Sequence, residues 1–172
     1  DLDRARQRLE SQAWIASAAV SRQFPSSIVI QVTERKPFAV VELERTHVVD
    51  REGVLLQPCD SCAALPFPRV TGVGQGADCS LGAVVPGLTP LLDMVALAQA
   101  SEFFSRYGLA VLDASNPRQI RLFTQHGEME VRLGERLTTA QLRDLDGVFR
   151  QLPEARRISY IGASGNRRVV VG

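Results

Sequence analysis

The sequence predicts an α+β fold, with a small unit of one helix and a small sheet followed by a mixed, mainly antiparallel β domain with two helices. Three observations lead to this prediction. A turn signal and a β-branched run lie near the N-terminus, alternating apolar and polar residues form a hairpin pattern near residue 130, and helix starts occur at residues 89 and 138. The 172 residues suffice for two small domains, which we place at 1–43 and 44–172.

The first unit begins with a polar, arginine-rich segment. Apolar residues recur there at helical spacing, which predicts an amphipathic helix from residue 2 to about 12. A turn is expected at Phe24–Ser27, because proline fixes φ and the serine hydroxyls satisfy nearby backbone groups. We expect strands at 18–22 and 28–33 around it. The second should be buried on one face and partly covered on the other, with a further strand of this sheet at 38–41.

The central part of the chain predicts a hairpin and then a long loop. Residues 47–56 place apolar pairs on both sides of an Asp-Arg-Glu-Gly turn, whereas residues 57–87 are rich in proline and glycine. Within the loop, Gly72-x-Gly74-x-x-Ala77 imitates a dinucleotide fingerprint. No helix start follows it to hold a pyrophosphate, so we interpret it as a glycine-rich loop.

Cysteine usage leaves two interpretations of this loop. The Cys59-x-x-Cys62 spacing fits half of a zinc site or a redox pair, but no second pair follows, and the strand and helix of a thioredoxin-like motif are missing. The simpler interpretation is a surface loop that carries one disulfide if the compartment is oxidising, with Cys79 nearby. His47 and His126 lie in strand and turn contexts, and we interpret His47 as structural.

The second domain is predicted from caps and alternation. Thr89-Pro90 starts a helix with threonine as N-cap, and its apolar stripe runs on to Gly108. A short strand at 109–112 and a hairpin at 120–133 with one wet face follow.

A capping box at Thr138–Gln141 then starts a second helix, which continues to Pro153. A turn separates the last two strands, near 158–161 and at 169–171.

Composition excludes several functional classes. The net charge of +1, from 20 basic and 19 acidic residues, gives no global field that favours nucleic acid or anionic lipid. No apolar run approaches the length of a membrane span. No Ser/His/Asp or Cys/His set has a recognisable context, so we predict a non-enzymatic protein without catalytic, cofactor-binding or metal-binding residues.

Several motifs of the chain are similar to one family. Part of the chain resembles the POTRA domain of the bacterial cell-division family FtsQ, called DivIB in Gram-positive bacteria. The resemblance rests on the aromatic Trp14, Ala-Val-x-Arg at 19–22, Phe-Pro at 24–25 and Thr-Glu-Arg-x-Pro-x-Ala at 33–39. Segments at 48–55, 65–72 and 133–134 resemble its second domain. The last strands depart from the family pattern, with Ile-Gly-Ala after Tyr160 and Val-Val-Val-Gly at the end.

The resemblance implies a place in the cell. It implies that the first unit is a truncated POTRA domain whose first strand is missing. A cytoplasmic segment and a single membrane-spanning helix would precede that strand. The chain would then lie on the periplasmic side of the bacterial inner membrane and meet the membrane only through that helix.

The resemblance also implies a scaffold role in septum assembly, with FtsB and FtsL as partners in a three-protein complex and other divisome proteins at the POTRA surface. A short terminal strand offers unpaired backbone groups, so an extended partner could add a strand there. The predicted partner-binding residues are Tyr160, Ile161, Arg167, Arg168, Val169, Val170 and Val171 in the C-terminal strand region, and Thr33, Glu34, Arg35 and Lys36 on the POTRA surface.

Two alternatives stay open at this point. A POTRA-bearing outer-membrane assembly or secretion factor would carry tandem POTRA repeats or a barrel downstream. The capped helices and hairpins of the second domain favour FtsQ instead. A periplasmic enzyme would need a pocket with convergent polar groups.

Overall fold

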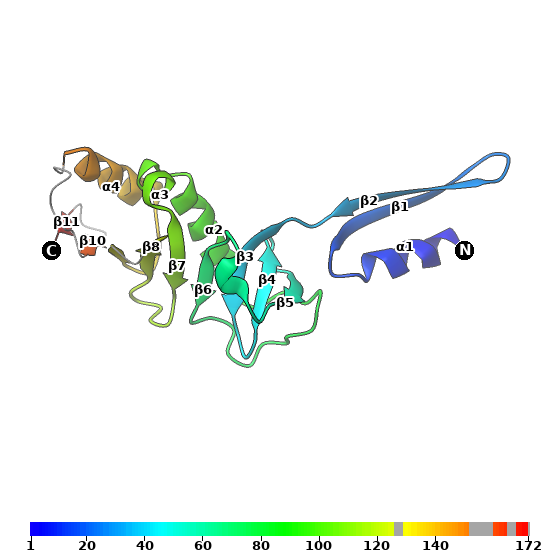
Figure 1. Cartoon of the computed structure of the whole chain (residues 1–172), viewed down its shortest axis with the longest axis horizontal. Coiled ribbons are helices and arrows are strands. Elements are labelled where there is room, and N and C mark those ends of the chain that lie inside the picture. The colour runs from blue at the N-terminus through cyan, green and yellow to red at the C-terminus, as the bar shows by residue number, and fades with distance from the viewer. Residues whose placement is uncertain (126–128, 152–159, 165–167, 172) are drawn as a thin grey trace.

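The chain folds around two separate β-sheets that lie at opposite ends of an elongated molecule (Figure 1). The computed structural model describes residues 1–125, 129–151, 160–164 and 168–171. A two-stranded sheet and one helix form the N-terminal end, and a nine-stranded sheet with the remaining helices forms the rest. The predicted α+β class, with its mixed second sheet, is confirmed.

The N-terminal end, which we call the hairpin unit, spans residues 1–34. Helix α1 (Leu2–Glu10) packs along β1 (Ile15–Gln23), which pairs antiparallel with β2 (Ser27–Glu34) across the predicted turn. The Glu10 carboxylate accepts a hydrogen bond from the Ala18 backbone N–H at 3.2 Å and so ties the helix to the strand. The predicted helix, turn and two strands are confirmed.

The third strand of the first unit belongs to the other sheet. We expected residues 38–41 to extend the small sheet, but β3 (Pro37–Glu42) pairs antiparallel with β4 (Thr46–Asp50) and parallel with β6 (Arg69–Thr71). Ala39, Val40 and Val41 are all buried, on both faces of the strand. Such a continuous apolar run suits the interior of a sheet covered on both sides rather than a half-exposed hairpin.

The large sheet has the order β11-β10-β9-β8-β7-β6-β3-β4-β5. The pairs β3–β6, β6–β7 and β9–β10 are parallel and the other pairs are antiparallel, as predicted for a mixed, mainly antiparallel sheet. The strands not yet given are β5 (Leu55–Pro58), β7 (Leu109–Asp113), β8 (Arg121–Thr124), β9 (Glu130–Leu133), β10 (Tyr160–Ser164) and β11 (Arg168–Val171).

Helices α2 (Leu88–Gln99), α3 (Glu102–Tyr107) and α4 (Thr139–Gln151) pack on this sheet and share one core with it. Helix α2 contacts β7, and α3 contacts both α2 and α4. The core includes Leu88, Leu92, Val95, Phe103 and Leu145 from the helices and Val41, Val70, Leu112, Leu122 and Ile161 from the strands. A second, smaller cluster of Val48, Val54 and Leu56 lies under the 57–65 loop, against Cys59 and Leu65.

The first predicted helix of this domain differs from the expectation in two ways. Helix α2 begins at Leu88, so Thr89 is not its N-cap and instead donates its hydroxyl to the Glu52 carbonyl at 3.4 Å. The helix also stops before Ser101, whose hydroxyl accepts the Phe104 N–H at 3.2 Å and caps the separate helix α3. An N-cap serine starts a new helix because it satisfies an otherwise unpaired N–H.

Two other local signals of this domain, the stop at Gly108 and the capping box, are confirmed, whereas the turn predicted at 126–127 and the helix end at Pro153 lie outside the described residues. Gly108 ends α3 with φ of 68°, and a Cβ there would come within 2.5 Å of the Gln125 side chain. The capping box is formed: the Thr138 N–H donates to the Gln141 side chain at 2.8 Å, and the Gln141 N–H donates back to the Thr138 hydroxyl at 3.2 Å.

Candidate partner-binding surfaces

The C-terminal strand lies at one end of the large sheet. Strand β11 pairs antiparallel with β10, with Gly162 opposite Val170 and Ser164 opposite Arg168. On its other side, no strand of the described part of the chain pairs with it. An end strand of this kind offers backbone N–H and C=O groups that an extended segment can pair with.

The structure gives the predicted residues of this region different places. Arg168, Val169, Val170 and Val171 form the end strand, and Tyr160 begins its neighbour, β10. The Ile161 side chain is fully buried in the main core, where it holds β10 against the sheet. Arg167 lies outside the described residues. Nothing in the structure tests their contact with a partner, so this role stays a prediction.

The second predicted surface, Thr33–Lys36, lies where the hairpin unit meets the large sheet (Figure 1). Thr33 and Glu34 end β2 and are exposed, as is Lys36. Arg35 is different, because its side chain is only 19% exposed and points toward the β4–β5 turn. The structure therefore offers three of these side chains to solvent and turns the fourth inward.

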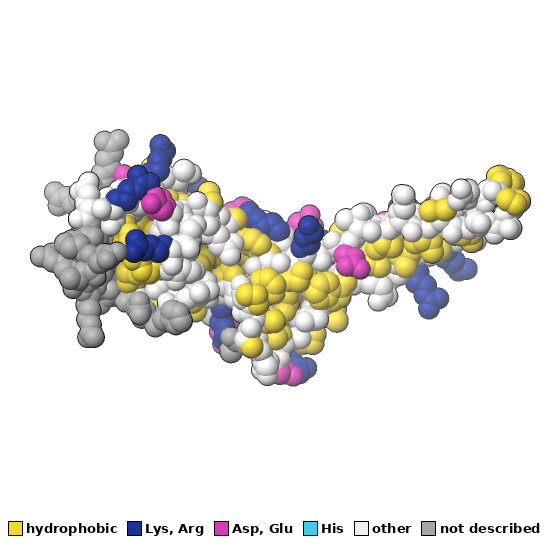
Figure 2. All heavy atoms as spheres, turned by 45° about the horizontal axis from the view of Figure 1, so that its top comes forward, with side chains coloured by type: hydrophobic (Ala, Val, Ile, Leu, Met, Phe, Trp, Pro, Cys, Tyr) yellow, Lys and Arg dark blue, Asp and Glu magenta, His cyan; other side chains and the backbone are white. Residues whose placement is uncertain are grey.

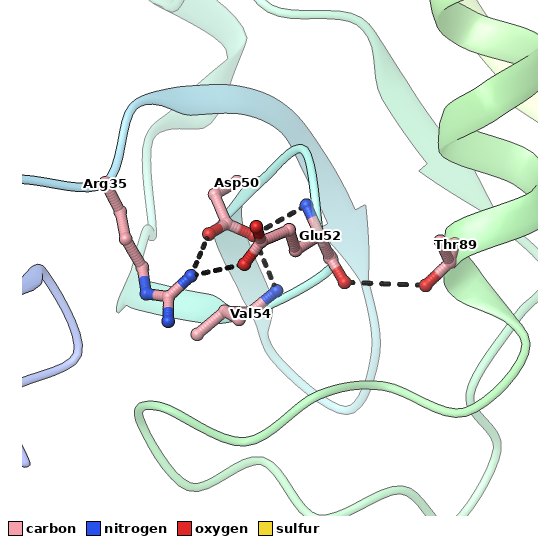
Figure 3. Close-up of polar contacts among 5 residues, drawn as sticks. All are labelled: Arg35, Asp50, Glu52, Val54 and Thr89. Atoms are coloured by element: carbon pink, nitrogen blue, oxygen red, sulfur yellow. Dashed lines mark hydrogen bonds and ion pairs between the residues drawn. The ribbon is translucent and has the colours of Figure 1, made fainter. Parts of the chain in front are cut away.

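Arg35 contacts two carboxylates of that turn (Figure 3). Its Nη1 donates to Asp50 Oδ2 at 2.7 Å and to Glu52 Oε2 at 2.8 Å. The hydrogen bond to Asp50 raises the pKa of the Arg35 guanidinium above its ordinary value, and the smaller opposing effect of burial does not cancel it. We call these three residues the Arg35 cluster. Neither carboxylate stands out in the sequence, because Arg35 is 15 or more positions away from both.

The hairpin unit also carries an apolar face that sequence analysis missed. We expected β2 to be buried on one face, but Ile28, Ile30 and Val32 are 60%, 53% and 43% exposed, and Phe24 at the hairpin tip is 93% exposed. Figure 2 shows hydrophobic side chains gathered along this hairpin. Helix α1 packs on β1 and leaves this face of β2 uncovered. A β-branched run predicts a strand but not what covers it.

The described face of the large sheet around β7–β9 carries paired charges rather than an apolar patch. Arg121 forms an ion pair with Asp113 on the neighbouring strand and lies over the Phe123 ring, while Arg132 pairs with Glu130 at 3.0 Å. The wet face predicted for this hairpin is thus present, and its charges are mutually neutralised.

The loop cysteines form a disulfide. Cys59 is bonded to Cys62, and Cys79 carries a free thiol. Within the described ranges, no three His, Cys, Asp or Glu side chains come together as possible metal ligands. None of the helices described has the length and apolar character needed to span a bilayer.

Comparison with known families divides the chain in two. Residues 1–35 match the model of the FtsQ-type POTRA domain, and residues 39–163 match the model of the C-terminal region of cell division protein FtsQ/DivIB. The gap between the two matches, residues 36–38, consists of the residue before β3 and the first two residues of that strand.

Individual relatives agree with these matches. The chain is 32% identical to cell division protein FtsQ of Syntrophotalea carbinolica, with 99% of this chain and 61% of the relative covered. It is 26% identical to FtsQ of Geobacter sp. strain M21, with 99% and 63% covered. FtsQ of Bradyrhizobium diazoefficiens is 40% identical over 45% of this chain and 22% of its own length. The chain thus spans about three fifths of the first two relatives.

Proposed function

Because the chain belongs to the FtsQ/DivIB family of cell division proteins, we propose that it is a non-enzymatic scaffold that links divisome proteins during septum assembly. The family match to 39–163 argues against the secretion-factor alternative, since it covers the domain that such a factor would replace by further POTRA repeats or a barrel. By the same resemblance, the chain lies on the periplasmic side of the inner membrane. A single membrane-spanning helix outside this sequence anchors it there. The domain boundary predicted between residues 43 and 44 stays a prediction, and in the structure β3 already pairs within the large sheet.

The observation that supports a binding role is the position of β11 at the end of the nine-stranded sheet. An extended segment can add a strand to such an edge through main-chain hydrogen bonds, while side chains of alternating direction give specificity. By resemblance to the family, the added strand comes from FtsB, bound together with FtsL. Val169–Val171 provide the template, and Tyr160 and Arg168 contribute side-chain specificity.

The hairpin unit provides the second contact of the scaffold. Thr33, Glu34 and Lys36 are exposed at its base, where other divisome proteins can reach them. Arg35 contributes to this surface through its ion pairs with Asp50 and Glu52 rather than by direct contact with a partner. Strand β11 lies at one end of the molecule and residues 33–36 lie near its middle, at the junction of the two units (Figure 1), and two separated contacts suit a protein that joins partners.

Calorimetric titration of this chain with the periplasmic segment of FtsB from the same organism tests the proposal. We expect binding by the intact chain and loss of binding after deletion of Arg168–Gly172. The matched control is Phe24→Ser at the hairpin tip, far from β11, which should bind like the parent.

Circular dichroism shows whether each variant is folded. Absence of binding by the folded, intact chain contradicts the proposal. Unchanged binding after the deletion contradicts strand addition at this edge, because the template strand is then absent.

A further inference from the structure

The hairpin unit and the large sheet share no hydrophobic core in the described part of the chain. Both core clusters draw their residues from position 38 onward. The buried residue of the hairpin unit, Ala18, packs within that unit and belongs to neither cluster. A shared hydrophobic core, which usually fixes the orientation of two units, therefore does not orient these two. They also approach each other at Gly82, where a Cβ would lie 4.0 Å from the Ala13 Cα.

Polar contacts across the junction all converge on Arg35. Among the described residues, the hydrogen bonds and ion pairs that join the segment up to Arg35 with the large sheet are those from its guanidinium to Asp50 and Glu52. The Arg35 backbone N–H donates to the Trp14 carbonyl at 2.8 Å, which ties the residue to the hairpin unit. Only Arg35 and Lys36 separate β2 from β3.

The turn that accepts the Arg35 guanidinium is also held by hydrogen bonds that do not involve Arg35. Asp50 Oδ1 accepts the backbone N–H groups of Glu52 and Val54 at 3.0 and 2.9 Å, which leaves Oδ2 for the guanidinium (Figure 3). The turn is also bound to α2, since the Thr89 hydroxyl donates to the Glu52 carbonyl.

A second bond to the same helix comes from Arg51, which pairs with Asp93 at 2.6 Å. A partner that is already positioned loses little freedom when the bond forms.

We propose that the Arg35 cluster is a joint that sets the orientation of the hairpin unit relative to the nine-stranded sheet. The bond to Asp50 carries most of the effect, because the Asp50 side chain is 6% exposed, whereas that of Glu52 is 75% exposed. Exposed ion pairs contribute little, and a buried carboxylate without its cation is costly. The joint fixes how far apart the two ends of the molecule are held, whatever binds to them.

Double electron–electron resonance on the whole chain, which measures the distance between two nitroxide labels, tests the joint. Nitroxide labels are placed at Ser27→Cys on β2 and Gln99→Cys on α2, both exposed, in a Cys79→Ser background that keeps the Cys59–Cys62 disulfide. We expect a single narrow distance distribution in this parent. Arg35→Gln should broaden it, because the guanidinium that spans the junction is lost.

Three further variants sharpen the test. Arg51→Gln removes an ion pair of the same turn that does not cross the junction, and it should leave the distribution narrow. Asp50→Asn keeps the Oδ1 acceptor of the turn but removes the charge that faces Arg35, so it should broaden the distribution. Glu52→Gln should broaden it least.

Thermal unfolding confirms that each variant is folded. A parent distribution already as broad as that of Arg35→Gln overturns the proposal. So does an Arg35→Gln distribution as narrow as that of the parent.

Discussion

Strands β2 and β3 follow one another in the chain, yet their side chains meet opposite surroundings. Ala39, Val40 and Val41 of β3 are fully or almost fully buried, whereas Ile28 and Ile30 of β2 are more than half exposed. The large sheet buries apolar side chains from helices and strands in one contiguous core. A two-stranded hairpin with one helix buries too little for much stability of its own. Similar runs of β-branched residues are thus buried in the core of the large sheet and exposed on the surface of the hairpin unit.

The largest effect should come from a matched pair of phenylalanines. Phe103 is buried, with the rings of Phe104, Tyr107 and Phe149 at about 5 Å, while Phe24 is 93% exposed. We expect Phe103→Ala to lower the free energy of unfolding by about 3–5 kcal/mol, through lost burial and a cavity. Phe24→Ala should change it by less than about 0.5 kcal/mol. Urea unfolding followed by circular dichroism measures both, and similar losses would break the comparison.

The junction between the two regions gives the next effect. Asp50→Ala leaves two turn N–H groups without their acceptor and Arg35 without one of its two carboxylates, so we expect a loss of about 1–3 kcal/mol in the stability of the large sheet. Glu52→Ala removes an exposed carboxylate of the same cluster and should cost less than about 1 kcal/mol. Chemical unfolding of both variants checks the order, and the reverse order would contradict the dominance of Asp50.

Within the hairpin unit, a smaller and local effect is expected. Glu10→Ala removes the acceptor of the Ala18 N–H, the side-chain hydrogen bond that ties α1 to β1. A typical net hydrogen bond stabilises by about 1 kcal/mol, so exchange of the amides along β1 should accelerate about fivefold. Amides of β7 should exchange as in the parent. Amide exchange followed by NMR distinguishes the two regions, and acceleration in both would mean that they unfold as one unit.

These contrasts show which parts of the fold could be predicted from the sequence. The capping box at Thr138–Gln141 was predictable, because the residues that make it lie within one turn of helix. The break at Ser101 was missed, since the apolar stripe continues through it. The sheet to which β3 belongs was predicted wrongly, because its membership depends on pairing with β6, about 29 positions further along the chain.

The candidate surfaces were predictable to different degrees. The strand at 169–171 was predictable from its run of β-branched residues, and the structure places β11 at the sheet end. The inward turn of Arg35 did not follow, because a charged motif gives no sign of the carboxylate that it will meet. The exposure of Ile30 could not be predicted either, since β-propensity indicates a strand but not which elements pack against it.

The smallest effect concerns acid, and it tests whether the polar face of the large sheet adds to the stability of its core. Burial by itself would raise the pKa of Asp113, but hydrogen bonds from Ser115 and Arg121 outweigh it and hold that pKa below its ordinary value of 3.8. A carboxyl group whose folded-state pKa is lowered binds its proton more readily in the unfolded chain. Its stabilising contribution is therefore fully present above pH 3.8 and is lost as the pH falls through the lower, folded-state pKa.

Asp113→Asn should thus slightly lower the free energy of unfolding at neutral pH and make its decline with falling pH less steep. The control is Asp60→Asn, which changes a side chain that is 85% exposed and should leave that decline as in the parent. Urea unfolding between pH 2 and pH 6 measures both slopes. An equally steep decline in Asp113→Asn would mean that the ion pair with Arg121 adds nothing to the sheet. This ion pair would then contribute nothing to the difference in stability between the large sheet and the hairpin unit.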